Sequence, residues 1–159
     1  MKTEAPAAAR EVETFEEYTL YSLERSTPTL LNMMERSKRI AGLWPDVVAL
    51  MEAAGLCQEI AALAGFQDTL GDLLGLAEGK DPVSEQWQRM RRELSVAMDT
   101  MEDVLTLQES SPIKRLFSVE LPEALNQCID VIPAVTRHLR EQFMTEGAGS
   151  EAMATGGDG

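Results

Sequence analysis

The chain has 159 residues, and its 27 acidic against 14 basic side chains give a net charge of -13, which is large for this length. A field of this sign repels phosphate backbones and anionic lipid surfaces, so we expect neither nucleic-acid nor membrane binding. Hydrophobic residues make up 44% of the chain but aromatic residues only 5%, which excludes general disorder and favours helices over a β-sandwich.

Cysteine usage and the first residues indicate a cytoplasmic protein. The two cysteines, Cys57 and Cys128, fall on apolar faces of predicted helices, where a free thiol behaves as a small hydrophobe. A disulfide between them is the alternative, although two cysteines make no disulfide framework. The first residues lack the apolar core of a signal peptide, and no uncharged apolar run reaches membrane-spanning length.

The first part of the chain predicts a disordered segment followed by a short helix. Residues 1–12 are rich in Ala, Pro and Glu and have no periodic apolar face. Thr14 and Glu17 then form a capping box, which predicts a helix that begins near Phe15 and ends by Ser26.

A second helix is expected to restart at Thr27-Pro28, with a cap and a first-turn proline. Its apolar residues step by four and three as far as Met51 and keep their phase across Pro45. This continuity favours one helix over 28–54, kinked at the proline, over two helices broken around Leu43 and Trp44.

Glycines then divide an apolar stretch, and a long helix follows it. The segments 56–64 and 66–77 each have the length of a short helix, with glycines suited to the turns between them. Over 81–109, Asp81 and Pro82 mark a helix start, and a heptad pattern predicts a helix that buries one seam. The seam residues are Val83, Trp87, Met90, Leu94, Ala97, Met101 and Val104.

The last part of the chain predicts a short helical piece over 113–117 and a heptad-patterned helix over 121–143, kinked at Pro133. Residues 146–159 lack an apolar face and are expected to be disordered, which leaves one domain over 13–145. The expected fold is an all-α antiparallel bundle with two long heptad-patterned helices, a Pro-kinked helix and several short Gly-separated helices. An extended hairpin that completes its core by dimerising is the second option.

No residue pattern in the chain predicts catalysis or metal binding, and we expect no enzyme and no cofactor. His138 is the only histidine, and its neighbours Arg137 and Arg140 indicate a surface position near a helix end. Zinc and di-metal sites need more His or Cys than the chain contains, and no EF-hand loop occurs. The glycines of 71–79 precede no Lys-Ser or Lys-Thr, so they form no phosphate-binding loop.

The charges are unevenly distributed along the chain. Lys and Arg are absent from residues 40–79, which nevertheless contain Asp46, Glu52, Glu59, Asp68, Asp72 and Glu78. The ordinary interpretation is a solvated surface with local pairs such as Glu35 with Arg39 and Glu85 with Arg89. The functional interpretation is an apolar-acidic region that binds a basic or amphipathic partner.

These patterns favour a non-enzymatic protein–protein interaction module, such as a helical adaptor, accessory subunit or assembly chaperone that binds a partner or itself. Two alternatives are an acidic mimic of nucleic acid that inhibits a basic protein, and a small-molecule-binding bundle. Aromatic, aliphatic and thioether side chains are the candidate anchors and nearby arginines the candidate rim. These candidate residues are Trp44, Val48, Met51, Trp87 and Met90 as anchors, with Arg89, Arg91 and Arg92 at the rim.

Overall fold

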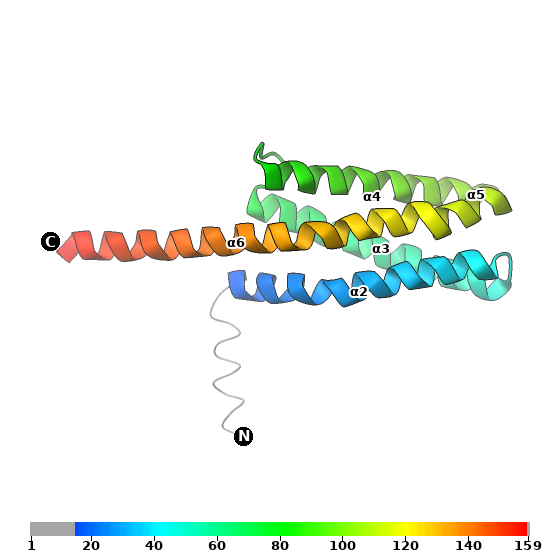
Figure 1. Cartoon of the computed structure of the whole chain (residues 1–159), viewed down its shortest axis with the longest axis horizontal. Coiled ribbons are helices and arrows are strands. Elements are labelled where there is room, and N and C mark those ends of the chain that lie inside the picture. The colour runs from blue at the N-terminus through cyan, green and yellow to red at the C-terminus, as the bar shows by residue number, and fades with distance from the viewer. Residues whose placement is uncertain (1–14, 159) are drawn as a thin grey trace, which may run out of the picture. The chain divides into compact units, whose positions relative to one another are not determined.

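The structure is a computed structural model that describes residues 15–158, and within these residues it contains helices and no strand (Figure 1). The all-α helical-bundle prediction is therefore confirmed. The expected disordered segment 1–12 lies outside the described residues. In chain order the elements are α2(Phe15–Leu43), α3(Val47–Leu74), α4(Pro82–Leu107), α5(Ser110–Arg115), the π-helical turn η1(Leu116–Glu120) and α6(Leu121–Asp158).

The chain divides into two compact units, Thr27–Val131 and the pair of segments Met1–Ser26 and Ile132–Gly159. In the second unit, Arg140 of α6 donates a hydrogen bond to the Glu24 carboxylate of α2 at 2.8 Å. Both divisions fall two residues before a proline, Pro28 in α2 and Pro133 in α6. Each proline removes one backbone hydrogen bond from its helix, which weakens the connection at that point.

Within the unit Thr27–Val131, α3 runs antiparallel to both α2 and α4. Arg36 and Arg39 of α2 pair with Glu59 and Glu52 of α3, so the order of the partners reverses. The order of partners also reverses between α3 and α4. Asp68 pairs with Arg91, whereas the sulfur of the earlier residue Cys57 lies 2.9 Å from the sulfur of the later residue Met101. Adjacent helices in this unit therefore follow the antiparallel arrangement that short connections impose (Figure 1).

The helix α4 follows its sequence pattern closely. Asp81 occupies the N-cap position with extended backbone, and its carboxylate accepts a 2.6 Å hydrogen bond from the Ser84 hydroxyl. All of the predicted seam is buried except Val83, whose place in the core is taken by Ser84. Gln108 ends the helix in the left-handed conformation, with its N–H bonded to the Val104 carbonyl.

The prediction of short helices between glycines is wrong, because 47–74 forms one helix of 28 residues. A helix-interior glycine costs about 1 kcal/mol relative to alanine, which packing against neighbouring helices can offset. The buried side of α3 supplies this packing through residues such as Leu56, Ile60 and Leu70. The glycine that does end the helix is Gly75, whose φ of 70° is the left-handed conformation of a C-cap.

The sequence also mispredicts where prolines interrupt helices. The helix breaks at Pro45, where a tight turn with a cis Trp44–Pro45 bond reverses the chain from α2 into α3. Proline disfavours helical backbone at the residue before it, and the unchanged heptad phase carried no information about direction. Conversely, α2 continues through Pro28 where a restart was expected.

The core of the unit Thr27–Val131 is mainly aliphatic and contains buried polar connections, one of which joins α2 to η1. Leu56, Ile60, Leu94 and Leu125 are fully buried. The hydroxyl of buried Ser37 on α2 donates a 2.6 Å hydrogen bond to the carbonyl of Phe117 in η1. Because a π-turn disturbs the regular backbone ladder, this bond satisfies a carbonyl in the core and fixes α2 against η1.

The helices α3 and α4 pack tightly against each other at Gly71. A Cβ atom placed on this glycine would lie 2.8 Å from Nε1 of Trp87, whose side chain is 3% exposed. The indole ring is held by the surrounding core and has no free end that can move aside. Glycine at this position therefore sets the distance between the two helices.

We predict that Gly71→Ala lowers the free energy of unfolding by about 1–3 kcal/mol, because the added methyl overpacks against Trp87. The matched change Gly65→Ala meets nothing within 4 Å. It should raise stability by about 0.5–1 kcal/mol through helix propensity. Urea unfolding followed by circular dichroism measures both; equal effects of the two substitutions would show that the Trp87 contact does not limit the packing.

Candidate functional site

The outer side of α3 carries large apolar side chains in contact with solvent. Val47 is 71% exposed, Met51 is 70% exposed and Leu73 is 57% exposed. Together with their exposed apolar neighbours they form a surface that we call the α3 face. Its residues are Val47, Val48, Leu50, Met51, Ala54, Ala61, Ala62, Gly65, Phe66 and Leu73.

The α3 face is bulky at its ends, and in its middle small apolar residues alternate with the exposed polar side chains of Gln58 and Thr69. Val47, Val48 and Met51 stand at the N-terminal end, and Phe66 and Leu73 stand toward the C-terminal end. Between them the exposed apolar positions are Ala54, Ala61, Ala62 and Gly65, which are small. A surface of this shape allows another helix to approach closely at its centre.

Acidic residues along the flanks of α3 are held by arginines from its neighbours. On the α2 side, Arg36 donates two hydrogen bonds to Glu59, at 2.8 and 2.6 Å, and Arg39 pairs with Glu52 at 3.0 Å. The Arg36 hydrogen bonds hold the pKa of the Glu59 carboxyl below its usual value. On the α4 side, Arg91 pairs with Asp68.

Three acidic residues at the ends of this segment have no such partner. Within the part of the chain that the structure describes, no ion pair or hydrogen bond reaches the side chains of Asp46, Asp72 or Glu78. Asp46 precedes the first turn of α3, Asp72 lies in its last turn, and Glu78 follows it in the turn before α4. The α3 face therefore has a neutral middle and acidic ends.

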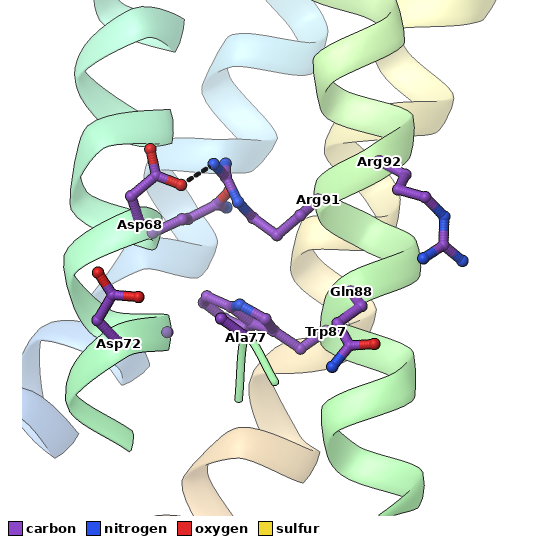
Figure 2. Close-up of a pocket in the computed structure, with 9 residues that line it drawn as sticks. Asp68, Asp72, Ala77, Trp87, Gln88, Arg91 and Arg92 are labelled. Atoms are coloured by element: carbon purple, nitrogen blue, oxygen red, sulfur yellow. Dashed lines mark hydrogen bonds and ion pairs between the residues drawn. The ribbon is translucent and has the colours of Figure 1, made fainter. Parts of the chain in front are cut away.

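A recess of about 390 Å³ opens between α3 and α4 beside the C-terminal end of the face. Figure 2 shows the Trp87 ring between the two helices, with Asp68 and Asp72 on one wall and Arg91 reaching across from the other. Arg91 donates to Asp68 and, at 2.9 Å, to the amide oxygen of Gln67. Arg92 also lines the recess, but its guanidinium extends away from α3 (Figure 2).

A buried thiol completes this polar cluster. The side-chain amide of Gln67 donates a 3.4 Å hydrogen bond to the sulfur of Cys128, which is almost fully buried. Burial raises the pKa of the Cys128 thiol to about 11. Burial also raises the pKa of the Cys57 thiol, and both cysteines are free rather than joined in a disulfide. These neutral thiols pack as small hydrophobes.

The candidate anchors and rim residues fall into four environments. Val48 and Met51 lie on the exposed α3 face, whereas Trp44 and Met90 are buried in the core. Trp87, Arg91 and Arg92 line the recess between α3 and α4, and Arg89 lies exposed on α4.

The sequence did not identify Phe66, Leu73 or Gln67 as members of a site. Phe66 and Leu73 were assigned to a separate short helix, which hid their alignment with Met51 on one face. No sequence pattern marks Gln67 as a site residue, because its hydrogen bonds are made with residues of α4 and α6 that lie far away in sequence.

One helix among the described residues, α3, is long and apolar enough to cross a membrane by length and composition. The sequence predicts no such segment, because acidic residues such as Glu52, Glu59 and Asp68 leave no uncharged apolar run of that length. Only 22% of the most apolar 18-residue window of α3 is buried, so burial in the protein core does not account for its hydropathy. Within the same described residues, no group of three acidic, His or Cys side chains is placed to hold a metal ion.

No protein-family model matches the chain, and no curated protein or solved structure is significantly similar to it.

We predict that Cys128 makes stability depend on pH in the alkaline range. The folded state keeps the thiol neutral up to about pH 11, whereas an unfolded cysteine ionises near pH 8.5. The contribution of the neutral thiol is fully present below about pH 8.5 and is lost as the pH rises, by about 2–3 kcal/mol at pH 11.

Cys128→Ser keeps an acceptor for Gln67 but does not ionise in this range, so it should abolish this component of the alkaline slope. Urea unfolding at pH 7, 9 and 10.5 measures the slope in both proteins. A uniform loss of stability with the wild-type slope retained would show that Cys128 does not titrate on unfolding.

Proposed function

We propose that this protein is a non-enzymatic protein–protein interaction module of the cytoplasm, in which the α3 face and its acidic ends bind a protein partner. The observation that carries this proposal is the exposure of Val47, Met51 and Leu73 on one helix. Clustered apolar side chains that remain in water mark interaction surfaces far more often than isolated ones do. A helical adaptor, an accessory subunit and an assembly chaperone all use such a surface.

The pairing of the flanking acids supports an apolar rather than a purely electrostatic interaction. Glu52, Glu59 and Asp68 are already engaged by arginines of α2 and α4. A mimic of nucleic acid would present such carboxylates free, in a regular row, to a basic protein. The apolar middle of the α3 face is better suited to burying hydrophobic surface.

A small-molecule-binding bundle is the second candidate, and the recess between α3 and α4 favours it. Its volume of about 390 Å³ lies in the range of ligand sites. Trp87 supplies an aromatic ring to its lining, and Gln67, Asp68 and Arg91 supply polar groups. Thermal-shift screening with metabolites tests this candidate, because a ligand of the folded state raises the melting temperature.

We predict that Met51→Gln combined with Leu73→Gln lowers retention of the native partner at least tenfold while the fold persists. Two exposed apolar anchors contribute about 1–2 kcal/mol each to an interface, and about 1.4 kcal/mol is tenfold in affinity. Affinity purification from the native cells, with quantitative mass spectrometry, measures the partner retained by each variant at 0.1 M and 0.5 M salt.

Val96→Gln is the matched control, because Val96 is 63% exposed on α4 and is not part of the α3 face. It should leave partner retention unchanged. The proposal fails if the double variant and the control retain the same proteins. A partner that leaves only at 0.5 M salt would instead support a nucleic-acid mimic.

A further inference from the structure

We infer that the occupant of the α3 face is an amphipathic helix of another protein that has an apolar middle and a Lys or Arg cluster at each end. This inference rests on the proposed function and specifies the chemistry of the partner. It follows from the order of charged, large and small residues along α3.

The sides of the face need no charge from a partner. Glu59 accepts two hydrogen bonds from Arg36, Glu52 accepts from both Nε and Nη2 of Arg39, and Asp68 is paired with Arg91. These ion pairs neutralise both flanks over the central turns of α3. A cation brought to the middle of the face would therefore lose hydration without gaining an unpaired carboxylate.

The ends of the face carry carboxylates that have no cationic partner within the described residues. Asp46 stands at one end, and Asp72 and Glu78 stand at the other, and no cation occurs anywhere in residues 40–79. Asp46 and Asp72 are separated by 26 positions, which corresponds to about 39 Å along a helix. A complementary helix aligned with α3 therefore needs about seven turns between its two cationic clusters.

The shape of the face specifies the apolar middle of the partner. Ala54, Ala61, Ala62 and Gly65 leave space beside the exposed Gln58 and Thr69 between the bulkier ends. Large side chains such as Leu or Met on the partner fill this region, while smaller ones fit against Met51 and Phe66. This alternation of large against small is the packing that facing helices use.

Charge also argues against the two other occupants of an apolar helix. A second copy would bring two segments without any Lys or Arg together, and each copy has a net charge of -13. An anionic bilayer surface would be repelled for the same reason. A cation-bearing helix is the one occupant that gains from both the apolar and the acidic parts of the face.

The test uses the purified full chain and three synthetic 28-residue helical peptides with the same leucine stripe. The first has two lysines at each end, the second has the same four lysines on the central turns, and the third has glutamates at the ends. Fluorescence anisotropy at 0.1 M salt measures their dissociation constants. The second peptide controls for general attraction between a cationic peptide and an acidic protein.

We predict that the end-lysine peptide binds at least tenfold more tightly than either of the others. Asp46→Asn combined with Asp72→Asn should weaken its binding about fivefold. Each exposed ion pair that is lost raises the dissociation constant by about a factor of two or slightly more. The control Asp99→Asn with Asp103→Asn makes the same change of charge on exposed positions of α4 and should alter binding less than twofold.

Equal binding of the end-lysine and central-lysine peptides overturns the inference, as does no binding by any peptide. A dimer in sedimentation that Met51→Gln with Leu73→Gln dissociates would assign the face to a second copy. Binding to neutral phosphatidylcholine vesicles through the same residues would assign it to lipid. If these results occur while the double glutamine variant still loses its cellular partner, the proposed function stands and only the partner chemistry is wrong.

Discussion

The structure depends on how α3, a helix without any cation, is attached to its neighbours. Arg36 and Arg39 reach it from α2, and Arg91 reaches it from α4, so every positive charge that holds α3 comes from another helix. These exposed pairs join α3 to both neighbours, while burial of its apolar side sets the rotation of α3 about its axis. Once that rotation is fixed, Leu56 and Ile60 point into the core, and Met51 and Leu73 must point to solvent. The exposed apolar face is thus the side of α3 that lies opposite to its buried side.

The helix α4 was predictable because its signals are local. Asp81 and Pro82 mark its start, and a heptad pattern marks its buried seam, so no knowledge of other helices is required. The helix α3 was not predictable, because its continuity depends on tertiary packing that offsets several glycines. Gly71 illustrates the difference: in sequence it resembles a turn residue, and in the fold it provides space for Trp87. The prediction of one continuous helix across Pro45 was wrong for a related reason. The heptad phase of the apolar residues is the same whether or not the chain reverses direction.

The candidate site was partly predictable for the same reasons. The sequence predicts Val48 and Met51 as anchors of a partner-binding surface, and both are exposed, because one turn of helix that is apolar all round cannot bury all of its sides. Trp44 and Met90 were chosen for residue type alone, and type does not distinguish a core anchor from a surface anchor. Local i,i+4 spacing paired Arg39 with Glu35, whereas in the fold Arg39 bonds Glu52 across the helix interface. Cross-helix pairs of this kind require the register of two helices, which a single sequence does not show.

The large negative charge and the apolar face are best understood together. An exposed apolar surface promotes association of identical copies, and a net charge of -13 opposes it. The repulsion acts between any two copies but becomes attraction toward a partner with cations near Asp46 and Asp72. Specificity then arises from a repulsive term against the wrong partner as well as an attractive term for the right one. On this argument, the absence of Lys and Arg from residues 40–79 contributes as much to recognition as the exposed apolar side chains of the α3 face.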